Sequence, residues 1–294
     1  MAKLNDKIFE GKRSSAEIAD TAFKFFGLAC TLFGMFILVV LMFDIIARGF
    51  HRISWEFITN LPSRRAASAG IYTAWVGTLW IMVVTALIAF PIGISAGLYL
   101  EEYNKKGRFA NFLEINIANL AGVPSIIYGL LGLEIFARFL HFGQSVLTGA
   151  CTLALLILPI IIVSTREALK SVPYSIREAS YALGATKWKT MWNQVLPASI
   201  AGIFTGVILA LSRAIGETAP LVVIGALAFV PFVPGGVFDS FTVLPIQIFN
   251  WISRPQKEFS ENAAAAIIIL LLITFVMNGI GVYIRYTWQK KIKW

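Results

Sequence analysis

Long apolar stretches alternate with short polar connections along this chain of 294 residues. Each stretch is long enough for an α-helix to cross the apolar core of a bilayer, which takes roughly 17 to 25 residues. Because no water is available there to satisfy backbone groups, such a segment has to be helical. The pattern predicts an all-α polytopic membrane protein with six transmembrane helices, at Ala22–Phe43, Ile71–Leu98, Phe112–Phe136, Val146–Val163, Ala198–Val230 and Ala263–Tyr286.

The composition supports this class of protein. Hydrophobic residues make up 57% of the chain and charged residues 14%, and the mean hydropathy is +0.75. That balance leaves too few polar side chains to cover a soluble globule. The net charge of +9 could indicate nucleic acid, but in a membrane protein an excess of Lys and Arg more often reports topology. We therefore expect membrane lipid around the chain and no nucleic-acid partner.

The distribution of Lys and Arg predicts the orientation. These residues gather at the N-terminus, near Lys105, in the segment Arg166–Lys189 and at the C-terminus, whereas the alternate loops hold fewer. The positive-inside rule then places both termini in the cytoplasm, although a basic cluster from His51 to Arg65 on the outer side runs against it. We predict a cytoplasmic segment at residues 1–21, a six-helix transmembrane domain at residues 22–286 and a cytoplasmic tail at residues 287–294.

The sizeable cytoplasmic connection, residues 165–197, predicts two short helices. Pro173 breaks the preceding structure, and Ser175 with Glu178 fits a capping box, which would start a helix that runs to about Leu183.

The end of that helix and the start of the next are also predicted. Gly184 can adopt the left-handed conformation that ends a helix. A second amphipathic helix should run from Thr186 to about Gln194, before Pro197 opens the fifth span. An alternative interpretation is a helix pair that lies on the lipid headgroups, because its Lys and Trp residues would suit that position too.

The fifth predicted span carries two charges. Arg213 lies roughly 20 Å from its start at 1.5 Å per residue, well inside a core of about 30 Å. Glu217, four residues on, would share its helix face, so the two charges can neutralise each other. Gly216 and Pro220 can loosen the helical hydrogen bonding, as happens where a transporter lines an internal site. A transport pathway is predicted here, with a purely structural ion pair as the alternative.

The chemistry of this pair suggests an anion that carries a proton. The guanidinium of Arg213 stays charged and makes bidentate hydrogen bonds to oxyanions. Glu217 would repel a fully ionised anion such as sulfate, but its carboxylate can accept a hydrogen bond from the P–OH group of phosphate. Thr218 beside this pair, and Ser125 after Pro124 in the third span, are further pathway candidates. At Pro124 a helix kink, satisfied by Ser125 or Tyr128, is the alternative.

Several segments resemble known transporters. Glu178 and Ala179, with Gly184 five residues after Ala179, resemble the cytoplasmic EAA loop of permeases in ABC importers, whose short helix docks on an ATPase subunit. The resemblance implies that these three residues couple the chain to such a subunit, and that the six spans have the type I, MetI-like architecture. Three further segments resemble the A-type (PstA-type) permeases of phosphate importers: Gly122–Gly132, Arg213–Pro220 and Leu244–Trp251.

The resemblance also implies the partners. In that family a second related permease completes a heterodimer around the pathway, two ATPase subunits bind below, and an extracytoplasmic binding protein delivers phosphate at the cytoplasmic membrane of a bacterium or archaeon. No phosphate-binding loop occurs in the chain, so ATP and Mg²⁺ are expected on the ATPase partner, and this subunit is expected to hold no cofactor and to be non-catalytic.

Other functions stay open. A permease for another oxyanion would use a similar charged span, and an ion-coupled secondary transporter would too, but the latter has no use for an EAA helix pair and usually shows inverted repeats. An intramembrane enzyme would need a further cluster of catalytic groups. His51 and His141 are too scattered for a metal site.

Overall fold

The computed structural model describes residues 2–103, 107–226 and 229–290, and Lys105 and the end of the predicted tail lie outside them. The described chain is helical, without β-strands. Its α-helices are α1 (Ala2–Gly49), α2 (Trp55–Thr59), α3 (Tyr72–Leu98), α4 (Arg108–Leu120), α5 (Ser125–Gly132), α6 (Val146–Lys170), α7 (Tyr174–Ala182), α8 (Lys187–Thr190), α9 (Leu196–Gly216), α10 (Ala219–Val223), α11 (Leu244–Ile252) and α12 (Lys257–Gln289).

Three π-helical segments extend these helices without a gap: η3 (Tyr99–Tyr103) after α3, η4 (Leu133–Phe139) after α5 and η5 (Met191–Val195) between α8 and α9. Five helices in the described residues are long and apolar enough to cross a membrane, and a bent pair of helices supplies a sixth span. The all-α, multi-span fold predicted from the sequence is confirmed.

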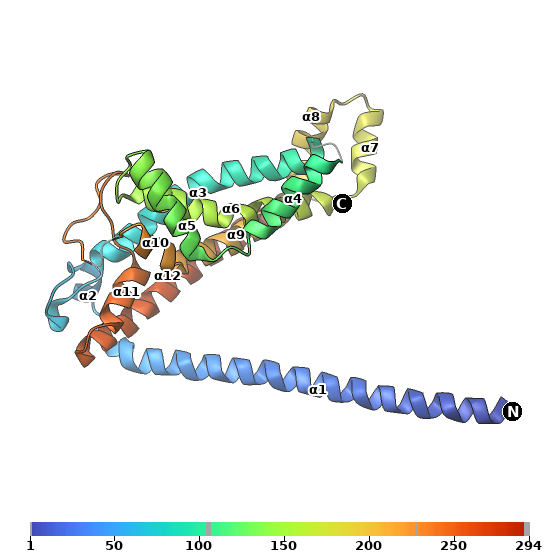
Figure 1. The fold of residues 1–294 in the computed structure, drawn as a ribbon, viewed down its shortest axis with the longest axis horizontal. Helices are drawn as coiled ribbons and strands as arrows, with labels where there is room; N and C mark the ends of the chain where they lie inside the picture. Colours follow the sequence, from blue (N-terminus) through green and yellow to red (C-terminus); the bar gives the residue numbers. More distant parts are fainter. Residues whose placement is uncertain (1, 104–106, 227–228, 291–294) are drawn as a thin grey trace.

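The bundle has two distinct ends. The C-terminal end of the described chain lies near α7 and α8, while α2 and α11 lie at the opposite end (Figure 1). The free end of α1 points toward the same side as α7 and α8 but lies away from the bundle (Figure 1).

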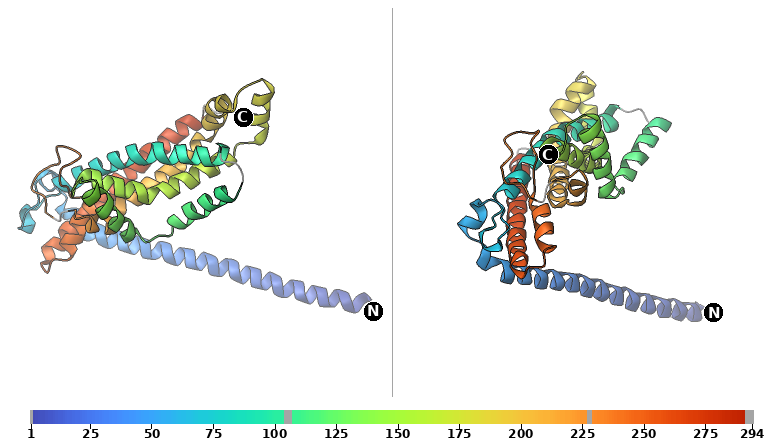
Figure 2. Two further views of the ribbon diagram at one scale, coloured as in Figure 1. Left: turned by 45° about the horizontal axis from the view of Figure 1, so that its top comes forward. Right: turned by 60° about the vertical axis from the view of Figure 1, so that its left-hand side comes forward.

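The first helix stands apart from the bundle. α1 is a single helix of 48 residues, and no residue in its most apolar window is buried within this chain. Figure 2 shows that it leaves the bundle at its C-terminal end, where Gly49 packs against the backbone of Ala264 in α12. The apolar surface of α1 therefore faces lipid or another subunit.

The third predicted span, Phe112–Phe136, is wrong as one continuous helix. The chain bends by 100° between Asn111–Leu120 and Ser125–Phe139. Pro124 lies at the bend. Proline favours a bend because it has no backbone N–H and because it disfavours helical geometry at the residue before it. In the fifth span α9 begins at Leu196 with Pro197 in its first turn, as predicted. The helical run nevertheless starts earlier and continues unbroken from Lys187 to Gly216.

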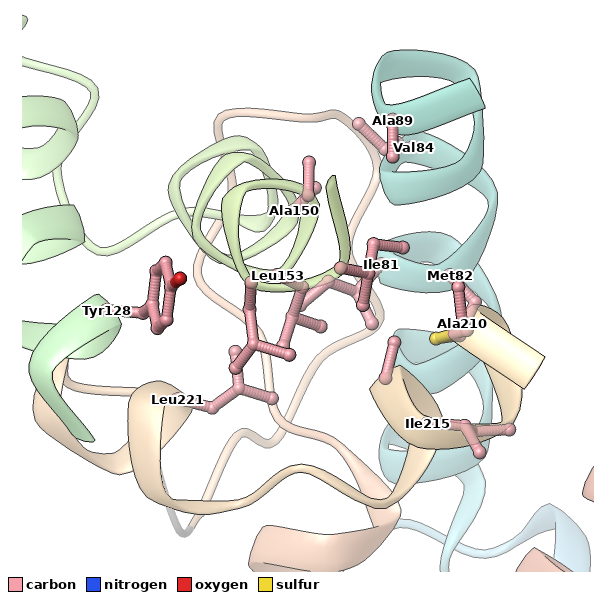
Figure 3. Packing of buried hydrophobic residues seen from close by; sticks show 14 of the residues in the cluster. Ile81, Met82, Val84, Ala89, Tyr128, Ala150, Leu153, Ala210, Ile215 and Leu221 are labelled. Atoms are coloured by element: carbon pink, nitrogen blue, oxygen red, sulfur yellow. The ribbon is translucent and has the colours of Figure 1, made fainter. Parts of the chain in front are cut away.

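The core joins the second, fourth and fifth spans. α3 packs along α6, and α6 packs along α9, with the buried side chains of Ile81, Leu153 and Ile215 at their centre (Figure 3). In a bilayer such packing depends on close fit between helices rather than on exclusion of water. These three helices form the core of the bundle, and the interrupted parts of the third and fifth spans extend from it.

Two aromatic residues near the α11 end of the bundle belong to the core. Trp251 and Phe241 are each only 1% exposed. Trp251 packs against Phe57 and Phe259, so these rings hold the outer connections onto α12.

Candidate functional site

The fifth span ends in a break at the position of the predicted charged motif. α9 stops at Gly216, and Glu217 continues with an extended backbone (φ −72°, ψ 123°). Thr218 then caps the short helix α10, which carries Pro220. The prediction that Gly216 and Pro220 interrupt the helix is confirmed, and Glu217 is consequently not part of the Arg213 helix.

Arg213 and Glu217 nevertheless form an ion pair. Arg213 Nε lies 3.3 Å from Glu217 Oε1. The arginine side chain is 42% exposed and the glutamate side chain 17% exposed, so the pair is less buried within this chain than its depth in the span suggests. Nη1 and Nη2 of Arg213 make no hydrogen bond to the residues that the structure describes, and both carry N–H groups that can donate.

The exposure of Arg213 has a consequence in a membrane. A charged side chain deep in a span avoids lipid and turns toward a water-filled cavity or another protein surface. An exposed arginine at this depth therefore faces either an aqueous path or the surface of a neighbouring subunit.

A polar contact from another span braces the helix beside Arg213. Ser212 Oγ lies 2.6 Å from Asn278 Oδ1 of α12, and 2.7 Å from the Ile208 carbonyl. Asn278 was not predicted as a functional residue, although a lone asparagine inside an apolar span is itself a signal of interhelical hydrogen bonding.

The break in the third span lies against the break in the fifth. A Cβ added to Gly129 of α5 would come within 2.7 Å of Pro220 Cα in α10, so a glycine is needed for these segments to approach. The Tyr128 ring, which projects toward the core in Figure 3, places its hydroxyl 2.8 Å from the Leu120 carbonyl. The kink interpretation of Pro124 is thus supported through Tyr128 rather than Ser125.

The four predicted pathway residues do not converge on one cavity. An apolar groove of about 610 Å³ lies between the two breaks and α11, and Thr218 lines it. The other three residues are not among those that line it. Ser125 begins α5 and is half-buried, without a described hydrogen bond to Arg213 or Glu217. The structure therefore joins Arg213 with Glu217 and places Thr218 beside them, whereas Ser125 remains apart.

The second candidate site is the helical connection at the end of the bundle where the C-terminal end of the described chain lies (Figure 1). α7 begins at Tyr174 with Pro173 as its cap, so the predicted capping box of Ser175 and Glu178 is wrong: proline pre-sets the helical entry. Gly184 has φ +79° and ends the turn as predicted. Glu178, Ala179 and Gly184 are all exposed, so the residues predicted to couple to another subunit lie on an accessible surface.

The second helix of the connection also differs in detail. Thr186 caps α8 by accepting a hydrogen bond from the Lys189 backbone N–H, and α8 then continues through η5 into α9 without a break. α8 and Arg213 therefore lie on one continuous helix. Among the described residues, no group of three or more His, Cys, Asp or Glu side chains could hold a metal ion.

Comparisons with known proteins identify the class. A family model described as "Binding-protein-dependent transport system inner membrane component" matches residues 89–286. The MetNI methionine ABC transporter, in inward-facing conformations, has a chain of the same fold, with a TM-score of 0.57 and 18% identity over 72% of this chain and 93% of that one. The chain belongs to this family of inner-membrane transport components and has the MetI-like architecture.

Two relatives in sequence indicate the type of permease within this family. The phosphate transport system permease protein PstA of Yersinia pestis is 35% identical over 85% of this chain and 84% of its own length. The probable ABC transporter permease protein YqgI of Bacillus subtilis is 31% identical over 85% of this chain and 90% of its own. Within the family, the chain is thus a permease of the PstA type.

Proposed function

We propose that this chain is the transmembrane permease subunit of an ATP-driven importer of inorganic phosphate, and that it forms half of the translocation pathway. The observation that carries the proposal is the ion pair of Arg213 and Glu217 at the break between α9 and α10. An arginine this deep in a span, with part of its guanidinium uncovered, suits a transient contact with an anion. The name of the PstA relative supports phosphate as that anion.

Glu217 contributes to selectivity in this proposal. Phosphate near neutral pH carries at least one proton, so its P–OH group can donate a hydrogen bond to the carboxylate while its other oxygens accept from Arg213. Sulfate has no such proton and meets only repulsion from Glu217. Thr218 would offer its hydroxyl at the entry to the apolar groove, and Ser125 would act at the neighbouring break.

The coupling residues follow from the exposed connection. Glu178, Ala179 and Gly184 would dock α7 on a separate ATPase subunit, which binds ATP and Mg²⁺ and performs the hydrolysis. The permease itself would remain non-catalytic and hold no cofactor. A second related permease would face the exposed side of Arg213, two ATPase subunits would sit at the α7 end, and an extracytoplasmic binding protein would deliver phosphate to the other end.

The proposed setting is the cytoplasmic membrane of a bacterium or archaeon. The multi-span fold and the family support an inner-membrane protein. Both termini would lie in the cytoplasm with α7, in agreement with the positive-inside distribution of Lys and Arg.

Competition for uptake tests the proposed substrate. The full complex, reconstituted in proteoliposomes with its binding protein, should take up radiolabelled phosphate when ATP is supplied to the ATPase side. Excess unlabelled phosphate should abolish the signal, whereas sulfate and molybdate should not. Uptake that sulfate or molybdate suppresses as strongly would support another oxyanion permease, and uptake that follows an ion gradient without ATP would support a secondary transporter.

A further inference from the structure

The buried contact of α7 with the bundle is made by a charged residue. Arg177 is the buried residue of α7, at 7% exposure, whereas Tyr174 and Leu183 at the two ends of the helix are 65% and 90% exposed. Ile176 adds a half-buried apolar contact to the cluster beneath, and Ser180 Oγ lies 2.8 Å from Thr190 Oγ1 of α8. The hydrogen bonds of Arg177 therefore position α7 on the spans, while Ser180 joins it to α8.

Arg177 connects α7 to two different spans. Its Nε and Nη2 lie 3.0 and 2.7 Å from Glu102 Oε1 in η3, the segment that continues α3. Its Nη1 donates to the Val172 carbonyl at 2.9 Å, and Nη2 donates to the Leu169 carbonyl at 3.0 Å. Leu169 belongs to α6 and Val172 follows its end, so one guanidinium joins α7 to both α3 and α6.

The second helix of the connection also reaches Glu102. Lys187 at the start of α8 donates from Nζ to the Glu102 backbone carbonyl, and its ammonium lies 4.9 Å from the centre of the Tyr103 ring. Burial and the Glu102 carboxylate raise the pKa of the Tyr181 hydroxyl above its ordinary value. Both helices of the connection therefore meet the chain at residues 102 and 103.

A gain in stability alone does not account for an ion pair in this position. The side chains of Arg177 and Glu102 are each 9% exposed, and desolvation of two charges offsets much of their attraction, so apolar residues of similar size often stabilise a fold as well. The pair instead fixes the orientation of α7, because the planar guanidinium of arginine directs its N–H groups toward several acceptors at once. An ion pair with this geometry makes α7 move together with the segments that it contacts and keeps α7 from sliding past them.

We infer that the ion pair of Arg177 and Glu102 is the joint that transfers movement of α7 to α3 and α6. This inference rests on the proposed function, and it makes Arg177 and Glu102 positioning residues of the transport cycle. Movement of α8 reaches Arg213 through the continuous helix of η5 and α9, whereas α7 has no such direct route to α3. Because the ion pair moves α3 and α6 with α7 while η5 moves α9 with α8, the helices α3, α6 and α9 shift together around the pathway.

The test removes both charges at once, which avoids leaving one charge buried and unpaired. Arg177→Gln combined with Glu102→Gln should still assemble with the partner subunits and hydrolyse ATP, but the phosphate transported per ATP should fall roughly tenfold or more, as expected for loss of a typical coupling free energy. The matched control is Lys170→Gln with Glu167→Gln, an exposed ion pair of α6 at the same end, with 2.9 Å between Lys170 Nζ and Glu167 Oε1. The control should transport normally.

A distance measurement separates this inference from the choice of substrate. Spin labels at Ser175→Cys in α7 and Ile92→Cys in α3, with Cys30 and Cys151 replaced by Ala, should keep one distance between nucleotide-free and ATP-trapped complexes. The distance should change with nucleotide in the double Gln variant. If the wild-type complex carries no phosphate but keeps this distance, the substrate is wrong and the joint stands. A double Gln variant with normal transport per ATP and an unchanged distance would overturn the joint.

Discussion

The Tyr128 hydroxyl donates a 2.8 Å hydrogen bond to the Leu120 carbonyl and so bridges the bend that separates α4 from α5. The carbonyl belongs to the last turn of α4 and also accepts a 3.1 Å hydrogen bond from the Val123 backbone N–H. A carbonyl has two lone pairs, so it can accept both bonds. The tyrosine supplies the second donor and fixes the position of α5 next to α10.

Removal of this hydroxyl should loosen the bend. Tyr128→Phe keeps the ring that packs in the core but removes one of the two hydrogen bonds to the Leu120 carbonyl, which should cost about 0.5–1.5 kcal/mol of stability. The thermal midpoint of the purified complex in lipid nanodiscs should fall. Tyr283→Phe, at an exposed position of α12, is the matched control and should leave the midpoint unchanged. Equal midpoints for both variants would show that the bend does not depend on this bond.

The orientation in the membrane can be tested by labelling. In a chain with Cys30 and Cys151 replaced by Ala, Ser175→Cys in α7 should react with a membrane-impermeant thiol reagent only after the cytoplasmic face is opened. Gln256→Cys, between α11 and α12, should react in intact cells, because α7 and α11 lie at opposite ends of the bundle (Figure 1). Labelling of Ser175→Cys in intact cells would contradict the predicted topology.

The turn after α7 offers a test of coupling without a packing change. Gly184 has φ +79°, and nothing lies within 4 Å of a Cβ added there. Gly184→Val should therefore act through backbone strain of about 1–3 kcal/mol and tilt α7 on its partner, so that phosphate uptake per ATP falls while the binding protein still docks. Gly184→Asn tolerates the left-handed region better and should retain most uptake. If the valine variant matches wild type, the turn has no part in coupling.

Local chemistry made much of the molecule predictable from its sequence. Run length and hydropathy gave the spans, because the bilayer allows few alternatives to a helix. The turn after α7 was predictable from Gly184, and the break between α9 and α10 from Gly216 and Pro220. Each of these residues acts on its own neighbours in the chain. The ion pair of Arg213 and Glu217 was predicted and is present, but the predicted shared helix face is wrong, because Glu217 follows the end of α9.

Contacts between distant segments were not predictable in this way. Glu102 and Arg177 lie 75 residues apart, and nothing in either segment alone indicates that they meet. The same holds for Ser212 and Asn278, 66 residues apart. The 100° bend after α4 also escaped prediction, because a proline in an apolar run is compatible with a mild kink as well as with a sharp turn. These features depend on how the spans pack.

The pathway assignment depends on the charges of Arg213 and Glu217. Arg213→Gln keeps much of the side-chain volume but removes the permanent charge and the bidentate fork. Hydrogen bonds to a charged group are worth about 1.5–3 kcal/mol, so phosphate uptake should fall on the order of 10- to 100-fold while the complex still assembles. Glu217→Gln keeps an oxygen acceptor for protonated phosphate and adds an N–H donor that suits sulfate. Sulfate should then compete with phosphate in this variant and not in wild type.

A purely structural ion pair makes a different prediction. In that case each single substitution leaves a charge without its partner and lowers the yield of assembled complex, whereas Arg213→Gln combined with Glu217→Gln restores both yield and uptake. The pathway assignment predicts that the double variant assembles but does not transport, because no charge remains to receive the anion. Complex yield from size-exclusion chromatography and phosphate uptake, measured on the same preparations, separate the two. Well-assembled Arg213→Gln complexes with a wild-type rate of uptake would place the anion path elsewhere in the bundle.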